Sequence, residues 1–112
     1  MNREFVFWKN YFDDFFKSLD DDSQRKVLWM LKSLASLPRI PGKFFKHIEG
    51  AKGLFELRIS WEGKAYRIFC FFEKGDKIIL CNGFVKKDKK TPKQEILKAV
   101  KIKEEYHYEN QK

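Results

Sequence analysis

The fold is decided by residues Leu54 to Lys87, which read LFELRISWEGKAYRIFCFFEKGDKIILCNGFVKK. Three runs rich in Ile, Phe and Tyr are separated there by Glu62-Gly63 and by Gly75-Asp76. Each pair contains a residue that readily adopts positive φ, which a two-residue hairpin loop requires. The stretch therefore predicts three consecutive antiparallel strands joined by two tight turns.

The first of these turns fixes the register of two strands. With Glu62-Gly63 as the loop, Trp61 pairs with Lys64, and Arg58 lies directly opposite Arg67. Like charges that face each other destabilise a sheet, whereas neutral or opposite pairs contribute roughly 0.2–1 kcal/mol. Two facing guanidinium groups therefore indicate an anionic ligand above the sheet.

Length and charge narrow the class of protein. The chain has 112 residues, enough for one domain, residues 1–112, with helices packed on a sheet. Its formal net charge is +8, residues 38–103 hold 17 basic and 7 acidic side chains, and 17% of the chain is aromatic. Basic and aromatic side chains together favour a polyanion whose bases can stack, although lysines that merely solvate a small domain give a similar composition.

The lack of a recognisable targeting signal and the placement of the cysteines predict a soluble, cytoplasmic protein. The N-terminal segment does not have the continuous apolar core of a signal peptide, and no stretch is long enough to span a bilayer. Cys70 and Cys81 fall on neighbouring predicted strands without metal-ligand spacing, which is typical of reduced packing residues. We expect neither a disulfide nor a metal site.

Two helices are predicted before the sheet. Asn10 caps a segment whose apolar side chains recur at helical spacing, namely Phe12, Phe15, Phe16 and Leu19. A second helix runs to about Leu37, with an apolar stripe of Val27, Leu28, Leu31, Leu34 and Ala35. Asp20-Asp21-Asp22 between them fits helix capping better than a metal site. The β-prone run Glu4–Trp8 could add a strand.

The predicted strands carry two different faces. The face for the two helices is apolar and consists of Phe55, Leu57, Ile59, Tyr66, Ile68, Cys70 and Phe72. The opposite face combines Glu56, Arg58, Arg67, Phe69 and Phe71, and Asn82, Phe84 and Lys86 of the third strand are expected on the same side. This mixture is more polar than a core and more apolar than a solvated surface, which indicates a binding face.

A last helix is predicted near the edge of the sheet. Thr91 can cap it, Pro92 fits its first position, and Gln94 completes a capping box. Its buried stripe is expected from Ile96, Ala99 and Val100. The segment Glu104–Tyr108 at its end is either a frayed terminus or a functional group of titratable and aromatic side chains.

Several motifs follow one another along the chain, namely LFELR at 54–58, YRI at 66–68, GFVKK at 83–87, KTP at 90–92 and EI at 95–96. In this order they resemble the phage-derived Gp49-like branch of the RelE/HigB toxin superfamily. The resemblance implies an α+β, RelE-like fold with an antiparallel sheet of about four to five strands, a two-helix hairpin packed on one face and a C-terminal helix. It also implies a type II toxin that cuts messenger RNA on the ribosome without metal or cofactor. The implied partner is a helix-turn-helix antitoxin similar to HigA.

The resemblance also assigns site residues. Arg58 and Arg67 match the family's sheet arginines and Lys86 its basic strand end, while Tyr106 and His107 resemble proton carriers near the C-terminus. These five are the expected catalytic residues. Contacts with RNA are expected from further basic and polar side chains, namely Lys46, His47, Lys52, Asn82, Lys87, Lys89 and Lys90.

Two alternatives from other classes stay open. Many relatives have a histidine where this chain has Asn82, and an amide cannot carry a proton near pH 7. A histidine can do so, but His47 fits an ordinary surface position in a basic loop. The chain could therefore be a non-catalytic RNA- or DNA-binding protein, or an inactive relative that acts as a protein-interaction module.

Overall fold

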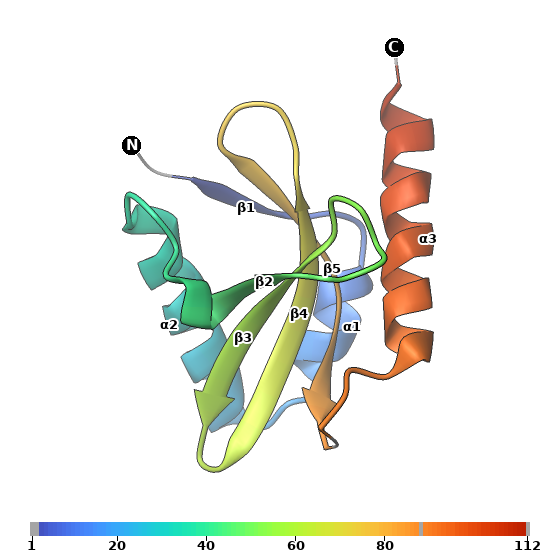
Figure 1. Cartoon of the computed structure of the whole chain (residues 1–112). Helices are drawn as coiled ribbons and strands as arrows, with labels where there is room; N and C mark the ends of the chain where they lie inside the picture. The colour runs from blue at the N-terminus through green and yellow to red at the C-terminus, as the bar shows by residue number, and fades with distance from the viewer. Residues whose placement is uncertain (1–2, 88, 112) are drawn as a thin grey trace.

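The computed structural model describes residues 3–87 and 89–111, so Met1, Asn2, Asp88 and Lys112 of the expected domain lie outside the described residues. Its elements are β1 (Glu4–Phe7), α1 (Tyr11–Lys17), α2 (Asp21–Ser36), the 3-10 helix η1 (Gly42–Phe44), β2 (Phe45–His47), β3 (Phe55–Trp61), β4 (Lys64–Phe72), β5 (Lys77–Lys86) and α3 (Lys93–Asn110) (Figure 1). The chain is α+β, as predicted, and its N-terminal run forms a strand.

The five strands form one sheet in the order β1-β5-β4-β3-β2. β3 pairs antiparallel with β4, and β4 pairs antiparallel with β5, as predicted. β2 lies in a stretch for which no strand was predicted and pairs antiparallel with β3, while β1 runs parallel to β5. A parallel pair requires a crossover connection, which the intervening helices and strands supply here. The sheet is therefore mixed rather than wholly antiparallel.

The β3–β4 hairpin has the predicted register. Trp61 pairs with Lys64, and Arg58 pairs with Arg67. Both residues of the Glu62-Gly63 loop have positive φ, 52° and 75°, as the central residues of a type I′ turn do. The local turn chemistry is therefore enough to place the two arginines opposite each other.

The β4–β5 connection is longer than predicted. Four residues, Glu73–Asp76, separate the two strands. The Glu73 backbone N–H donates to the Lys77 carbonyl at 2.9 Å, and Gly75 takes the positive φ of 74°. The prediction of a two-residue Gly75-Asp76 turn was therefore wrong, although the glycine has the expected conformation.

α1 and α2 pack on one face of the sheet, as predicted. Their side chains form a core with the strand residues Leu57, Ile59, Tyr66, Ile68, Cys70, Ile78 and Leu80. Gly83 of β5 allows α1 to approach closely, because a Cβ at this position would lie 2.6 Å from the Phe15 ring. The glycine of the Gly-Phe motif therefore has a packing role.

Side chains from outside α2 form hydrogen bonds with backbone groups at both ends of this helix. The Asp20 carboxylate accepts a hydrogen bond from the Ser23 backbone N–H at 2.8 Å, and this bond lowers the pKa of Asp20. At the other end the Arg3 guanidinium donates to the carbonyl oxygens of Leu34 and Leu37 at 2.6 and 2.7 Å. A cation there also suits the helix dipole. The aspartate run thus begins with a helix cap, as predicted.

α3 covers the opposite face of the sheet, which corrects its predicted position near the edge. It packs through Ala99 and Ile102 on strand residues of that face, which are Phe69, Phe71, Ile79 and Cys81. Phe69 and Phe71 were expected on an open binding face, but they are 0% and 1% exposed. The apolar runs of β4 and β5 are nearly continuous, as in strands buried on both faces, and this pattern required a second cover.

A β-bulge in β5 determines which side chains reach the α3 face. Ile68 pairs with Gly83 and Cys70 pairs with Leu80, so two residues of β5, 81 and 82, stand opposite one residue of β4. The bulge leaves Phe84 paired with Arg67 on the predicted side, where its ring stacks on Phe69 at 5.7 Å.

Cys70 and Cys81 lie in the cores on opposite faces of the sheet. Both thiols are free. Burial raises the pKa of Cys70 well above its ordinary value and raises the pKa of Cys81 to about 12. Both cysteines are therefore inert packing residues, as predicted.

Three local predictions were wrong. Leu28 and Phe72, predicted to be buried, are 47% and 51% exposed, because Leu28 points away from the sheet and Phe72 is the last residue of β4. α3 begins at Lys93, and the Thr91 hydroxyl donates to Glu56 Oε2 at 2.9 Å instead of capping the helix. A buried carboxylate thus competes successfully for the hydroxyl.

Candidate nucleic-acid interface

The two facing arginines line a hollow at the β3 side of the sheet. β2 pairs with Phe55, Glu56 and Leu57 of β3 and does not extend alongside Arg58. Beyond this point α2 and η1 enclose a hollow of about 550 Å³, here called the arginine hollow, lined by Lys26, Trp29, Met30, Lys43, Phe44, Arg58, Ser60 and Arg67. Four of these side chains are basic, and none of the described lining residues is acidic. The hollow therefore favours an anion.

The two arginine side chains differ in burial and in the contacts that hold them. Arg67 is 7% exposed and donates through Nη1 to the Tyr66 carbonyl at 3.0 Å. Its Nε lies 3.8 Å from Glu56 Oε1, an ion pair too long for a hydrogen bond. The pKa of Arg67 is lowered, chiefly because the side chain is buried. The Glu56 carboxylate opposes this effect, and the neighbouring Arg58 adds to it. Arg67 is therefore held in place, whereas the half-buried Arg58 can adjust to a ligand.

Polar contacts connect the sheet beside the arginines to the start of α3. Glu56, 3% exposed, directs one carboxylate oxygen to the Thr91 hydroxyl and the other toward Arg67. Asn82, 2% exposed, donates through Nδ2 to the backbone carbonyl and the Oε1 of Glu95, at 3.2 and 3.0 Å. Glu56 is therefore the carboxylate paired with Arg67. Asn82 is thus buried and tied to Glu95 of α3.

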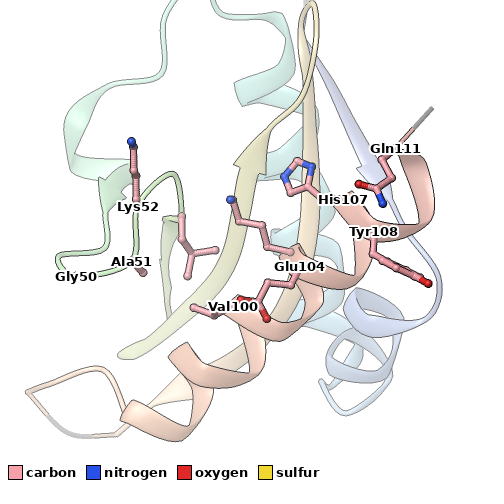
Figure 2. Close-up of a pocket in the computed structure, with 10 residues that line it drawn as sticks. Gly50, Ala51, Lys52, Val100, Glu104, His107, Tyr108 and Gln111 are labelled. Carbon is pink, nitrogen blue, oxygen red and sulfur yellow. The ribbon is translucent and has the colours of Figure 1, made fainter.

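A second hollow, here called the α3 hollow, lies between the β2–β3 loop and α3 (Figure 2). It measures about 530 Å³. Figure 2 shows the loop residues Gly50, Ala51 and Lys52 on one side and Val100, Glu104 and His107 of α3 on the other. Lys103 adds a second lysine to the lining. The structure therefore brings two predicted site residues, Lys52 and His107, to one hollow.

Tyr106 and His107 lie far from the arginine pair. The His107 ring contacts the Phe71 ring, with centroids 5.3 Å apart. Phe71 is four residues beyond Arg67 on the same strand, which corresponds to about 13 Å. Burial and the neighbouring Glu73 carboxylate raise the pKa of Tyr106. The structure thus separates the two arginines from the two predicted proton carriers.

The segment Glu104–Tyr108 is helical, so the alternative of a frayed terminus was wrong. The Lys9 ammonium pairs with Glu105 at 3.1 Å and with Glu109 at 2.6 Å. The Tyr11 hydroxyl donates to Glu105 at 2.5 Å, and this hydrogen bond, followed by the one from Lys9, lowers the pKa of Glu105. These contacts fasten the end of α3 to Lys9, which precedes α1, and to Tyr11, the first residue of α1.

The other predicted site residues lie at three further places. Lys86 is two residues beyond Phe84, the partner of Arg67, but it lines a separate hollow with Lys64 and Lys87. His47 on β2 accepts a hydrogen bond from the Gly53 backbone N–H at 3.3 Å. The remaining predicted RNA contacts, Lys46, Lys89 and Lys90, are exposed.

The described residues offer neither a cluster of metal-ligating side chains nor a membrane-spanning helix. Within residues 3–87 and 89–111, no group of three or more His, Cys, Asp or Glu side chains is placed to hold a metal ion. In the same part of the chain, no helix combines the length and apolarity that crossing a membrane requires.

A family model described as Phage derived protein Gp49-like (DUF891) matches residues 14–104. The chain belongs to this Gp49-like family. The match begins in α1, ends in α3 and includes every residue that lines the arginine hollow. No curated protein matches the chain. The family is associated with the toxins of toxin–antitoxin systems, and this context indicates an antitoxin as partner.

Six of the eight residues that line the arginine hollow of this Gp49-like protein were not identified as site residues from the sequence. They include Lys26 and Trp29 of α2 and Lys43 of η1. One signal was available: Trp29 lies off the buried stripe of Val27, Met30, Leu31 and Leu34, so it is an aromatic residue at a solvent-facing helix position. That α2 reaches the β3 side of the sheet could not be predicted from local spacing.

Proposed function

We propose that this Gp49-like protein is the toxin of a type II toxin–antitoxin system and that it cleaves messenger RNA on the ribosome. The observation that carries the proposal is the arginine hollow, in which Arg58 and Arg67 face each other among further cations. Planar guanidinium groups suit the two-pronged recognition of a phosphate. The family's association with toxins adds the cellular role.

The proposed reaction is attack of a ribose 2′-oxygen on the adjacent phosphorus. The new O2′–P bond forms while the P–O5′ bond breaks, which leaves a 2′,3′-cyclic phosphate and a 5′-hydroxyl. The 2′-hydroxyl loses its proton, and the leaving oxygen gains one. Negative charge grows on the phosphorane in between, and Arg58 and Arg67 stabilise it. The buried Glu56 pairs with Arg67 and keeps its guanidinium in place.

The proton steps depend on groups that lie apart from this pair. Asn82 cannot carry a proton, and Tyr106 and His107 contact the ring of Phe71, whose position on β4 is about 13 Å from that of Arg67. In this proposal charge stabilisation is the main contribution of the arginine hollow. Protons pass between the RNA and Tyr106 or His107 through water, and the lysines predicted to bind RNA contact flanking nucleotides. Cleavage of free RNA should therefore be slow, and RNA held by the ribosome should be cleaved faster because it is already oriented.

The proposed inhibitor is a helix-turn-helix antitoxin similar to HigA. A hollow with four basic side chains attracts acidic groups, so an antitoxin that covers it would block phosphate binding. Complex formation should then weaken as salt increases, because the attraction between exposed charges is screened.

A non-catalytic RNA-binding protein is the second candidate, and the separation of the arginines from Tyr106 and His107 favours it. The same arginine hollow would bind RNA with steep salt dependence but would break no bond. The two candidates differ in their products, since only the toxin generates new RNA ends.

Induced expression followed by mapping of messenger RNA ends tests the proposal. The unaltered protein should arrest growth and leave 5′-hydroxyl ends in translated messages. Arg58→Ala should slow cleavage by roughly 10²–10³-fold, as for a lost oxyanion donor. Lys98→Ala, which removes an exposed charge from α3, is the matched control and should behave as the unaltered protein. RNA binding without growth arrest or new ends would leave the non-catalytic candidate.

A further inference from the structure

Trp29 on α2 is exposed to an unusual degree for a large apolar side chain. It is 59% exposed, whereas Val27 and Met30 beside it are 0% and 7% exposed. The core therefore does not depend on this indole. Tryptophan is usually largely buried in soluble proteins, so an exposed indole is an informative observation.

Two hollows of the surface meet at Trp29. One is the arginine hollow, and the other, of about 600 Å³, is lined by Asp22, Arg25, Lys26, Trp29 and Trp61. We call the second one the tryptophan hollow. Lys26 and Trp29 line both. The two hollows together therefore form a continuous surface from Trp61 to the arginine pair.

Cations and aromatic rings alternate along this surface. The Lys26 ammonium lies 4.8 Å from the centroid of the Trp29 ring and 5.3 Å from that of Trp61. Asp22, the acidic residue of the tryptophan hollow, already pairs with Arg25. Net positive charge thus lies beside two indoles, in the pattern by which proteins bind single-stranded nucleic acid through phosphate contacts and base stacking.

We infer that Trp29 is a stacking platform for a base of single-stranded RNA, one that neighbours the phosphate held by Arg58 and Arg67. This inference rests on the proposed function for the phosphate site and adds the residue that receives the base. Lys26 contacts a phosphate next to the stacked base and holds the indole by its cation–π contact. Stacking accepts every base, so the platform positions the strand and selects sequence only weakly.

Fluorescence titration with a short 2′-O-methyl RNA oligonucleotide tests this inference, because blocking the 2′-oxygen prevents cleavage. The chain has three tryptophans, so the assay compares the unaltered protein with Trp29→Phe and Trp29→Ala. Trp29→Ala should weaken binding roughly 5- to 150-fold, the range for loss of one stacked base. Trp29→Phe should retain part of the affinity but lose most of the quenching. Leu97→Ala, at a side chain that is 60% exposed on α3, is the control and should bind normally.

Salt dependence separates stacking from charge. Arg58→Ala should reduce the slope of log affinity against log salt by roughly 0.7 for a single strand, whereas Trp29→Ala should lower affinity at unchanged slope. Normal affinity of a folded Trp29→Ala protein would overturn the inference. If the Trp29→Ala protein also escaped neutralisation by a co-expressed antitoxin, Trp29 would be a contact with a protein and not with RNA. Quenching through Trp29 without cleavage of translated messages would support the platform and refute the proposed toxin activity.

Discussion

Replacing Arg67 by alanine should destabilise the protein, whereas replacing Arg58 should not. From the sequence alone both changes would be neutral or stabilising, because each removes one of two facing guanidinium groups. The structure breaks this symmetry. Arg67 is 7% exposed and pairs with Glu56, which is 3% exposed, so Arg67→Ala leaves a buried carboxylate with only the Thr91 hydroxyl. Arg58 is half-buried, and its removal leaves no buried charge behind.

The magnitude follows from two opposing contributions. Removing one partner of a buried ion pair lowers stability by about 3–5 kcal/mol, and the 3.8 Å separation with a remaining hydroxyl contact places Glu56 near the lower value. Relief of the arginine repulsion returns roughly 0.2–1 kcal/mol. The expected loss for Arg67→Ala is therefore about 2.5 kcal/mol, or about 10 °C in Tm for a chain of this length. Arg58→Ala should change the stability by less than about 1 kcal/mol.

Urea unfolding and thermal melting of the two single variants measure this difference. The double variant Arg67→Ala with Glu56→Gln should recover most of the lost stability, because it no longer buries a carboxylate. An Arg67→Ala protein as stable as the unaltered one would refute the argument from the buried pair. A double variant no more stable than Arg67→Ala would also refute it, since the loss would then come from packing alone.

Two further predictions concern packing and pH. Gly83→Ala should lower the free energy of unfolding by roughly 1–3 kcal/mol, because its Cβ would lie 2.6–2.9 Å from the Phe15 ring, whereas Gly42→Ala, with no described atom within 4 Å of its Cβ, should be nearly neutral in the same denaturant assay. Equal losses would exclude the Phe15 contact as the cause. Glu105→Gln should be less stable than the unaltered protein at pH 7. The hydrogen bond from the Tyr11 hydroxyl lowers the pKa of Glu105 in the folded protein, so the carboxylate stabilises the fold above the pKa that it has in the unfolded chain, about 4.3. This stabilisation is lost as pH falls through the lowered pKa of the folded state, and the difference between the two proteins should close there. A difference that persists to pH 2 would contradict this sign.

The parts of the fold that depend on neighbouring residues could be predicted from the sequence. The Glu62-Gly63 turn determines the pairing of Arg58 with Arg67, because a two-residue loop leaves one register. The helix cap at Asp20 and the packing face of α1 and α2 follow from spacing in the same way. Each of these features is determined within a few residues of the chain.

The parts that depend on distant segments could not be predicted in this way. Phe69 and Phe71 were assigned to an open face because nothing in their own strand shows that α3 will cover them. Thr91 has the sequence of a helix cap, and only the fold brings Glu56 close enough to take its hydroxyl. Trp29 joins the arginine hollow for the same reason, since α2 reaches the β3 side through tertiary packing.

The cover provided by α3 changes where RNA can approach. An open sheet face would have let a strand of RNA lie along β4 from Arg67 to Phe71, past both groups of predicted catalytic residues. Because α3 buries Phe69 and Phe71, that path is closed by apolar packing. The arginine pair is instead reached from the β3 side, where β2 does not extend alongside Arg58 and where Lys26, Trp29 and Lys43 surround the hollow. In the proposed function, an RNA whose phosphate lies on Arg58 and Arg67 would therefore reach Tyr106 or His107 by passing around α3, not beneath it. The side chains of α2 and η1 that line the arginine hollow would then guide the strand to the arginine pair.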